Sequence, residues 1–300
     1  MKKYMLLTQT NSSDWALNEW AKNGALSFVI FKKMPKCLRA LRRLWLNFRL
    51  PFSSIWYSRE WKVRLQECDI IVVHMSELTL QIPKYINRCN PAAKVIAWYW
   101  NTVNQKSDPR RIMGKCELWS FDPMDCKKYG MRFNHQYYFK SLIQESSEKE
   151  WDVFFCGNDG GRGEILTKLY NVFVEQKVTV NFKIVNPKYN KIPNELKSNF
   201  LSYSIINECN RKSRAILEIM RTGQSGATVR LMEALFNKKK IITNNPFVKK
   251  EPFYNENNIF IIGERPLEEL KAFIDSDYDN SSDKYIDEYD FNNWLKNFDN

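Results

Sequence analysis

The sequence lacks the marks of a zinc protein, a disulfide-bonded secreted protein or a membrane-spanning chain. None of its seven cysteines forms a CxxC pair, and none lies near a histidine at zinc-site spacing. Their odd number disfavours a complete disulfide framework, so we expect reduced thiols in a cytoplasmic protein. Residues 1–8 hold too short an apolar run for a signal peptide. No apolar stretch approaches the roughly 20 residues that span a bilayer, which leaves only peripheral membrane contact.

Positive charge is in excess. The chain has 46 Lys and Arg against 34 Asp and Glu, a formal net charge of +12. This balance favours nucleotides, nucleic acid or an anionic membrane as partners, although a lysine-rich surface that serves solubility fits equally well. The sequence shows no RRM-type aromatic motif, no helix-turn-helix signature and no zinc module. We therefore expect no nucleic-acid partner, while charge and aromatic content keep a nucleic-acid-binding protein as an alternative.

The pattern of the chain predicts two domains of the α/β class. Its 300 residues exceed the usual size of one domain. Strand-like and helix-like segments alternate in both halves, which predicts parallel sheets with helices on both faces. Ligands bind beyond the carboxyl ends of such strands, so two Rossmann-like domains facing a cleft would place the site in that cleft. The predicted strands are residues 4–8, 26–31, 69–74, 94–100, 117–121, 151–156, 178–185, 214–220, 240–243 and 259–262.

A glycine-rich turn, residues 157–163, follows the first predicted strand of the C-terminal half and opens a helix. Glycines let the backbone approach a ligand closely, and the N–H groups of a helix N-terminus favour phosphate. Arg162 adds a cation that can grip a phosphate with two nitrogens. Gly157, Asn158 and Arg162 are therefore candidate phosphate-binding residues. The alternative is an ordinary turn, because the dinucleotide fingerprint and the Lys-Ser/Thr ending of a P-loop are absent.

A second glycine-containing polar loop, residues 222–228, leads into a helix that is apolar on most faces and should be buried. The N–H groups near its start could hold a diphosphate. Candidate residues in this loop are Gln224, Ser225, Gly226 and Thr228.

On the helix itself, Arg230, Glu233 and Asn237 are spaced by three and four, so they form one polar stripe. Charges on a buried helix need partners or a polar cleft. We expect Arg230 to bind the diphosphate and Glu233 to accept hydrogen bonds from ribose hydroxyls. The alternative is an internal Arg230–Glu233 pair with Ser225 as a plain helix cap.

These motifs resemble a known family. Gly-Gln-Ser-Gly at 223–226, Arg230, Glu-Ala-Leu at 233–235 and Lys-Ile-Ile-Thr-Asn-Asn at 240–245 resemble the donor-site segment of bacterial GT-B glycosyltransferases. The relatives are enzymes of capsule and lipopolysaccharide (O-antigen) synthesis, including CgeB-like ones. Residues 151–157 with Arg162 resemble the first strand and loop of the same domain. The likeness covers about residues 151–265, and the N-terminal half is similar only in pattern.

The resemblance implies a nucleotide-sugar donor, a lipid-linked or oligosaccharide acceptor, no cofactor and usually no metal. The sequence shows no obvious DxD metal motif in a suitable loop. By this resemblance, residues 1–140 are an acceptor domain, 141–150 a linker and 151–280 a donor domain. Residues 281–300 would form a C-terminal helix that could cross back to the N-terminal domain, with Trp294 as its anchor. Many retaining relatives have a glutamate eight residues before the ribose-binding one, where this chain has Ser225, so retention and inversion both stay open.

GT-B chemistry needs cations beside the departing nucleoside diphosphate and, in an inverting enzyme, a base for the acceptor hydroxyl. Arg162 is the first choice of cation and Arg230 the second, with Lys212 and Arg214 as further candidates. The base would come from the N-terminal domain. Asp14, His74 and Asp122 each follow or end a predicted strand there, and the sequence does not choose among them. Without a working base, the chain would be a non-catalytic sugar-nucleotide-binding partner of a polysaccharide assembly.

Residues 32–64 are basic and amphipathic. Apolar side chains recur at helical spacing at Leu38, Leu41, Trp45 and Phe48, with basic residues around them. This pattern suits an anionic membrane surface, on the inner face of the plasma membrane if the acceptor is lipid-linked. An ordinary surface helix that packs on the sheet fits equally well.

Overall fold

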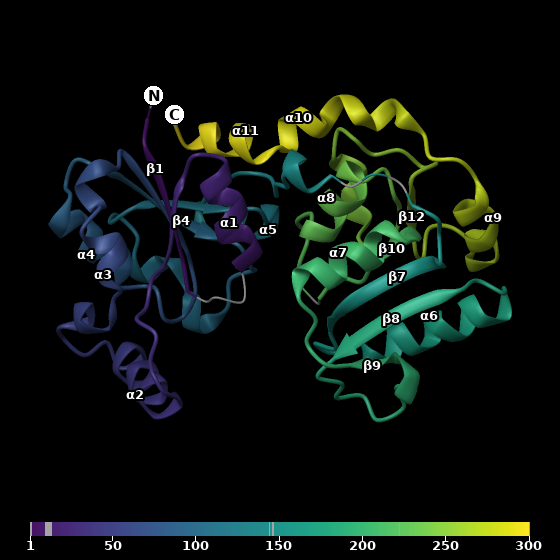
Figure 1. The fold of residues 1–300 in the computed structure, drawn as a ribbon, viewed down its shortest axis with the longest axis horizontal. Coiled ribbons are helices and arrows are strands. Elements are labelled where there is room, and N and C mark those ends of the chain that lie inside the picture. Colours follow the sequence, from purple (N-terminus) through teal and green to yellow (C-terminus); the bar gives the residue numbers. More distant parts are fainter. Residues whose placement is uncertain (1, 10–13, 144, 146, 222, 300) are drawn as a thin grey trace. The chain divides into compact units, whose positions relative to one another are not determined.

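The computed structural model describes residues 2–9, 14–143, 145, 147–221 and 223–299. The chain divides into two compact units, which are described separately (Figure 1). The first unit comprises Met1–His135 and Trp294–Asn300, and the second comprises Gln136–Asn293. Residues 141–150 belong to the second unit, and the last residues of the chain belong to the first.

The first unit is built on a six-stranded parallel sheet in the order β2-β1-β3-β4-β5-β6. Its central strand β3 is a run of β-branched residues buried on both faces, as a parallel sheet covered by helices requires. The strands are β1 Tyr4–Thr8, β2 Leu26–Val29, β3 Ile70–His74, β4 Lys94–Tyr99, β5 Glu117–Ser120 and β6 Arg132–Phe133, and the helices are α1 Asp14–Lys22, α2 Lys36–Asn47, α3 Arg59–Lys62, α4 Ile82–Cys89 and α5 Pro123–Tyr129.

The C-terminal residues complete the core of this first unit. Helix α11, Phe291–Lys296, carries Trp294, which is fully buried. Its ring lies 5.2 Å from that of Trp98 and 4.7 Å from that of Phe298. The Asn134 amide donates to the Trp294 carbonyl oxygen (3.1 Å). Residues about 160 positions apart in the sequence therefore share one apolar core.

The second unit repeats the architecture, with a parallel sheet in the order β12-β11-β10-β7-β8-β9. The expected α/β class with two Rossmann-like units is thereby confirmed. The strands are β7 Trp151–Asn158, β8 Val180–Val185, β9 Lys197–Ser198, β10 Ser213–Glu218, β11 Lys240–Thr243 and β12 Ile259–Ile261, and the helices are α6 Gly163–Glu175, α7 Tyr203–Arg211, α8 Val229–Phe236, α9 Leu270–Asp275 and α10 Ile286–Tyr289.

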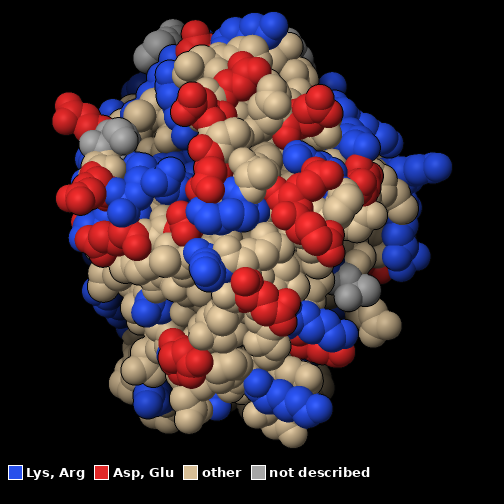
Figure 2. Space-filling model, turned by 90° about the vertical axis from the view of Figure 1, so that its right-hand side faces the viewer, with Lys and Arg blue, Asp and Glu red and all other residues tan. Residues whose placement is uncertain are grey.

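Two surface properties bear on partners. Within the described part of the chain, no helix is both long and apolar enough to cross a bilayer. Figure 2 shows one face of the molecule, on which acidic and basic side chains are interspersed. On that face the excess positive charge does not gather into one continuous basic surface.

Candidate functional site

The candidate site lies in the second unit where the sheet changes its direction of winding. β7 and β10 are neighbours, but the chain continues from β7 to β8 on one side and from β10 to β11 on the other. Such a switch point leaves a crevice beyond the carboxyl ends of the two strands, where ligands of open α/β sheets bind. The loops that leave β7 and β10 here are the two polar loops that the sequence indicated.

Asp159 shapes the first of these loops. Its Oδ1 accepts hydrogen bonds from the backbone N–H of Gly161 (3.1 Å) and Gly163 (2.8 Å), and its Oδ2 from those of Lys188 (2.6 Å) and Tyr189 (2.9 Å). Burial works against the charged form, but these four donors prevail and lower the pKa of Asp159. The N–H groups of Gly161 and Gly163 are therefore bonded to a carboxylate of their own loop.

Arg162 joins the two loops. Its side chain is buried, its Nε donates to the Asp159 carbonyl oxygen (3.1 Å), and its Nη1 donates to that of Ile219 (2.7 Å). Its Nη2 donates to the Asn158 carbonyl oxygen. Burial, together with neighbouring arginines, lowers the pKa of Arg162 to about 10, so it remains charged at neutral pH. With three of five N–H donors used by the backbone, Arg162 braces the loops and keeps at most two donors for a ligand.

Arg230 lies beside Arg162. It stands on the first turn of α8, is partly buried, and donates through Nη2 to the Cys156 carbonyl oxygen. Both guanidinium groups lie over the Phe155 ring, at 5.5 Å for Arg162 and 5.4 Å for Arg230. A Cβ atom at Gly157 would come within 2.7 Å of Arg230 Nη2 and 3.3 Å of Arg162 Nη2. A glycine at 157 is what makes room for the two cations.

Arg221 is the third member of this arginine cluster, which we define as Arg162, Arg221 and Arg230. Its exposed side chain follows β10, and its Nε lies 3.4 Å from where a Cβ of Gly160 would stand. The charge of Arg221 also contributes to the lowered pKa of Arg162. None of the salt bridges among the described residues involves the cluster. Three cations that converge without forming a salt bridge favour the binding of an anion.

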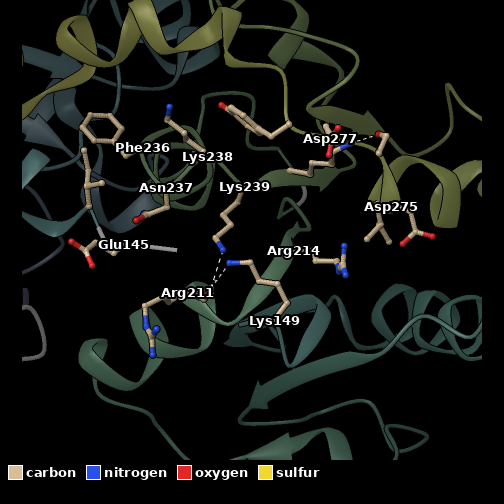
Figure 3. A pocket seen from close by; sticks show the side chains of 15 residues that line it. Glu145, Lys149, Arg211, Arg214, Phe236, Asn237, Lys238, Lys239, Asp275 and Asp277 are labelled. Atoms are coloured by element: carbon tan, nitrogen blue, oxygen red, sulfur yellow. Dashed lines mark hydrogen bonds between the residues drawn. The ribbon is translucent and has the colours of Figure 1, made fainter. Parts of the chain in front are cut away.

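Arg221 was not among the cations predicted from the sequence, whereas Lys212 and Arg214 were further candidates after Arg162 and Arg230. Both lie at the opposite, amino end of β10, where Lys212 pairs with Glu150 (2.5 Å) and Arg214 with Asp152 (3.4 Å). A separate pocket opens at that edge of the sheet (Figure 3). The two side chains therefore belong to a different surface from the arginine cluster.

A buried carboxylate positions the second loop. Glu218, the last residue of β10, is fully buried and accepts hydrogen bonds from the hydroxyls of Thr243 (2.6 Å) and Thr228. The Thr228 hydroxyl also accepts from the Arg230 backbone N–H (3.1 Å), so Thr228 caps α8. The expected alternative, Ser225 as the cap, is wrong; Ser225 is buried and its carbonyl oxygen accepts from the Asn245 amide (3.3 Å).

Glu233 faces helix α7. Its Oε1 accepts from the Tyr203 hydroxyl (2.8 Å) and its Oε2 from the Asn210 amide (3.2 Å). Burial raises the pKa of Glu233. The charge of Arg230 works against this rise in pKa, although no salt bridge joins the two side chains within the described residues. The contact of Glu233 with a ribose stays a prediction.

The remaining donor candidates lie on the same two loops. The Asn158 side-chain oxygen accepts from the Asn186 amide (3.0 Å) after β8. The Gln224 N–H donates to the Arg221 carbonyl oxygen (3.1 Å), which closes a tight turn. Gly226 is buried just before the cap of α8. With the exception of Lys212 and Arg214, the candidates of the C-terminal half therefore lie at the end of β7, on the two loops that leave β7 and β10, and on helix α8.

The three candidate bases lie in the first unit. Asp14 begins α1, and its side chain lies outside the described part of the structure. His74 lies between the rings of Trp20 and Trp100, each 4.9 Å away, and its buried Nε2 has no hydrogen-bond partner among the described residues. Burial lowers the pKa of His74 to about 3. An imidazole with so low a pKa binds a proton weakly, which makes it a poor general base at neutral pH.

Asp122 is fully buried after β5 and caps α5 by accepting from the N–H groups of Met124 (2.9 Å) and Asp125 (3.2 Å). Its carboxylate therefore has a structural task. Among the described residues, no group of His, Cys, Asp or Glu side chains could hold a metal ion.

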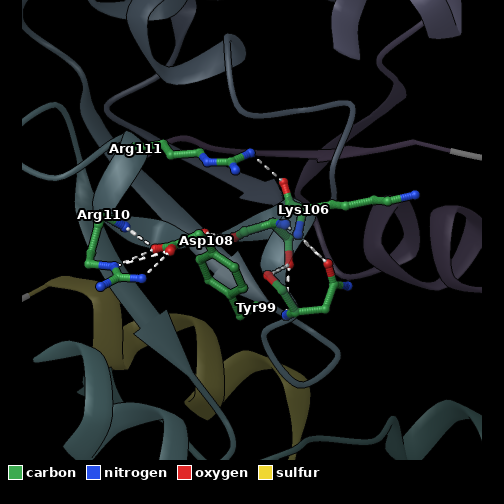
Figure 4. Close-up of polar contacts among 7 residues, drawn as sticks. Tyr99, Lys106, Asp108, Arg110 and Arg111 are labelled. Atoms are coloured by element: carbon green, nitrogen blue, oxygen red, sulfur yellow. Dashed lines mark hydrogen bonds and ion pairs between the residues drawn. The ribbon is translucent and has the colours of Figure 1, made fainter.

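The loop that follows β4 in the first unit is braced and basic (Figure 4). The Tyr99 hydroxyl donates to the Ser107 carbonyl oxygen (2.9 Å), and Arg110 grips Asp108 through Nε and Nη2. The hydrogen bond with Arg110 lowers the pKa of Asp108 to about 2. Lys106 and Arg111 extend from the same loop.

No protein-family model matches the chain, and no curated protein matches it. Solved structures do. HepE of Anabaena, in complex with UDP, is 9% identical with a TM-score of 0.63, over 99% of this chain and 98% of that chain. The lipopolysaccharide outer core galactosyltransferase WaaB is 12% identical with a TM-score of 0.55, over 100% and 98%. A DNA-modifying β-glucosyltransferase is 12% identical with a TM-score of 0.51, over 100% and 95%.

At these identities the likeness concerns the fold. It extends over the whole of each chain, so both Rossmann-like units have counterparts in each of the three structures. The protein has the GT-B fold of glycosyltransferases, which confirms that part of the resemblance.

Proposed function

We propose that the protein is a glycosyltransferase that takes a sugar from a nucleotide-sugar donor. The observation that carries the proposal is the arginine cluster at the switch point of the second sheet, in a chain with the GT-B fold. Three solved structures of the same fold are described as a galactosyltransferase, a glucosyltransferase with its substrate uridine diphosphoglucose, and a complex with UDP. The donor's diphosphate would bind Arg221 and Arg230, with Arg162 holding the two loops in place.

The cluster suits the reaction as well as binding. During transfer the bond between the anomeric carbon and the diphosphate oxygen breaks, and negative charge grows on that oxygen. The acceptor hydroxyl forms the new bond to the same carbon and gives up its proton to a base. Preorganised guanidinium groups stabilise the leaving diphosphate in a site where water is scarce. We therefore propose transfer without a metal ion, since these cations supply the charge that a metal would supply.

We further propose that the acceptor is a lipid-linked glycan of surface polysaccharide synthesis, reached at the cytoplasmic face of the membrane. Helix α2 supports this, because Leu46 is the only buried residue among its twelve. Seven apolar side chains on α2 and the segment after it are between 41% and 78% exposed: Leu38, Leu41, Leu44, Phe48, Leu50, Phe52 and Ile55. The exposed Arg39, Arg43 and Arg49 lie among them. Exposed apolar and basic side chains together favour an anionic lipid surface.

A cavity beside α2 could receive the charged part of such an acceptor. It measures about 210 Å³ and is lined in part by Arg49, Lys106 and Arg111, with Leu46 and Leu78. The acidic Glu77 at its edge is paired with Arg43 (2.8 Å). A basic cavity next to an exposed apolar helix fits a glycan attached to a lipid through phosphate.

We expect Phe48→Ser to weaken binding to vesicles that contain an anionic phospholipid by about 10- to 100-fold, because a fully inserted aromatic side chain contributes roughly 1.5–3 kcal/mol. Co-sedimentation measures the bound fraction. Phe200→Ser is the matched control, since Phe48 and Phe200 are both 74% exposed and Phe200 lies in the second unit. If both variants lose vesicle binding equally, or if neither does, the proposed membrane contact through α2 is contradicted.

The function is tested by incubating the protein with a panel of UDP-, GDP- and CMP-sugars and measuring release of the free nucleotide. We expect slow hydrolysis of one donor class, because many transferases pass sugar to water when no acceptor is present. Tight nucleotide binding with neither hydrolysis of the donor nor transfer to any acceptor tried would instead indicate a non-catalytic binding partner. Tight binding of an RNA oligomer with no nucleotide binding would contradict the proposal; the mixed charge in Figure 2 disfavours that outcome for the face shown.

A further inference from the structure

The second unit contains another basic site, at the edge of the sheet opposite the arginine cluster. A pocket of about 450 Å³ opens where β10 and β11 begin and where α8 ends (Figure 3). The six residues of β10 separate the two edges by roughly 20 Å. A phosphate group bound to the arginine cluster therefore cannot also contact this pocket.

Basic residues predominate in the lining of this amino-edge pocket. Six are basic and three are acidic: Lys149, Arg211, Arg214, Lys238, Lys239 and Lys240, with Glu145, Asp275 and Asp277. Several of these charges are already matched. Arg211 pairs with Glu208 (2.6 Å), Lys238 with Asp283 (2.6 Å), and Asp275 with Lys271 (2.8 Å).

The ammonium group of Lys240 has hydrogen-bond partners at the end of helix α9. Its Nζ donates to the Phe273 carbonyl oxygen (2.6 Å) and to the Ser276 hydroxyl at the end of α9. A lysine in this position satisfies carbonyl groups of a helix C-terminus and interacts favourably with the helix dipole.

Lys239 differs from Lys240 because its ammonium group lies beside a second ammonium group. Its side chain is 7% exposed, and its Nζ donates to the carbonyl oxygens of Ser213 (2.7 Å) and Arg211 (2.9 Å). Lys149 Nζ donates to the same Arg211 oxygen (3.0 Å), so two lysines from distant parts of the chain converge on one atom (Figure 3). Lys239 forms no salt bridge among the described residues. A buried ammonium group beside a second one calls for an anion.

We propose that the amino-edge pocket binds a small phosphate-type oxyanion, with the ammonium groups of Lys149 and Lys239 as its main donors. The anion would add negative charge beside the two converging ammonium groups, in a lining where basic residues outnumber acidic ones. Burial, with Lys149 and Arg211 adding to it, lowers the pKa of Lys239 to about 7, which is the behaviour of a cation held without its counter-charge. The Lys239 ammonium group has three N–H donors, of which the Arg211 and Ser213 carbonyl oxygens accept two. The site is independent of the sugar-nucleotide proposal.

The test is calorimetric titration of the full-length protein with inorganic phosphate, pyrophosphate and UDP, at constant ionic strength set with sodium chloride. The protein carries Arg221→Ala and Arg230→Ala, which disable the arginine cluster. We expect saturable binding of phosphate or pyrophosphate to this double variant. Adding Lys149→Met should weaken it by about tenfold or more, since a charge-assisted donor is lost.

Lys149 is the first choice for substitution because its side chain is only partly buried, so the variant should fold. Lys239→Met is the second variant, and its melting temperature checks its fold. Lys168→Met is the matched control, as Lys168 is 72% exposed on α6 and pairs with Glu164. Absence of saturable phosphate and pyrophosphate binding, or binding that neither lysine variant weakens, would overturn the proposal. Binding of UDP alone would also overturn it, because the site would then require the nucleoside.

UDP binding to the wild-type protein, measured in the same series, reports separately on the arginine cluster. Its loss in the double variant, with phosphate binding retained, is the result expected if both sites exist.

Discussion

Replacing Arg230 with alanine is expected to weaken binding of the donor nucleotide about 10- to 100-fold, because a hydrogen bond to a charged group contributes roughly 1.5–3 kcal/mol. The fold should persist, since Arg230 is partly buried and its side chain has one hydrogen bond to the protein, at the Cys156 carbonyl oxygen. Calorimetry with UDP and GDP measures the affinity, and circular dichroism checks the fold.

Arg214→Ala is the matched control for this substitution. Arg214 stands on the adjoining strand β10, but at its amino end, where its side chain is 49% exposed and pairs with Asp152. It should leave nucleotide affinity unchanged. If Arg214→Ala and Arg230→Ala weaken binding equally, net charge rather than the arginine cluster would explain the affinity.

Arg162→Ala would be a poorer probe of the same contact. Its guanidinium group donates to the carbonyl oxygens of Asn158, Asp159 and Ile219, so alanine would remove three hydrogen bonds that hold the two loops together. A loss of affinity in that variant would mix loop disorder with the loss of a ligand contact.

Replacing Trp294 with alanine is expected to lower the free energy of unfolding of the first unit by about 3–5 kcal/mol, the usual cost of removing a large buried aromatic side chain. Trp294 is fully buried and lies against Trp98 and Phe298. The transition in urea should therefore begin at a lower concentration. Phe200→Ala, at a position 74% exposed in the second unit, is the control and should change little. A change of less than about 1 kcal/mol for Trp294→Ala would mean that the C-terminal segment adds nothing to the first core.

Most of the fold was predictable because the strands are buried apolar runs between polar loops. Segments such as β3, with four consecutive fully buried residues, leave little choice of structure. Strands β6 and β9 were not predicted; each has two residues and lies at a sheet edge. Two residues carry no periodicity, so only their neighbours in the sheet define them.

The candidate site was predictable in position but less so in detail. Both polar loops stood out through their glycines, yet nothing in the sequence shows that Asp159 captures the Gly161 and Gly163 amides. Arg162 and Arg221 are the same residue type in the sequence. In the structure, Arg162 is buried and holds the two loops together, while Arg221 is exposed. Their difference arises from backbone carbonyl groups that only the folded loops bring together.

Glu218 illustrates the same limit. A carboxylate at the end of an apolar strand was a signal that could have been used, because a charge there needs partners. Its partners, Thr228 and Thr243, come from a different helix and a different strand. Sequence spacing alone could not place three such residues at one point.

The measurement that tests the central claim most directly is calorimetry of UDP against uridine, with the wild-type protein and the Arg221→Ala/Arg230→Ala variant. If the arginine cluster binds the donor's diphosphate, wild type should bind UDP about 100-fold more tightly than uridine, and the variant should bind the two almost equally. A variant that still prefers UDP as strongly as wild type does would contradict the assignment of the donor site.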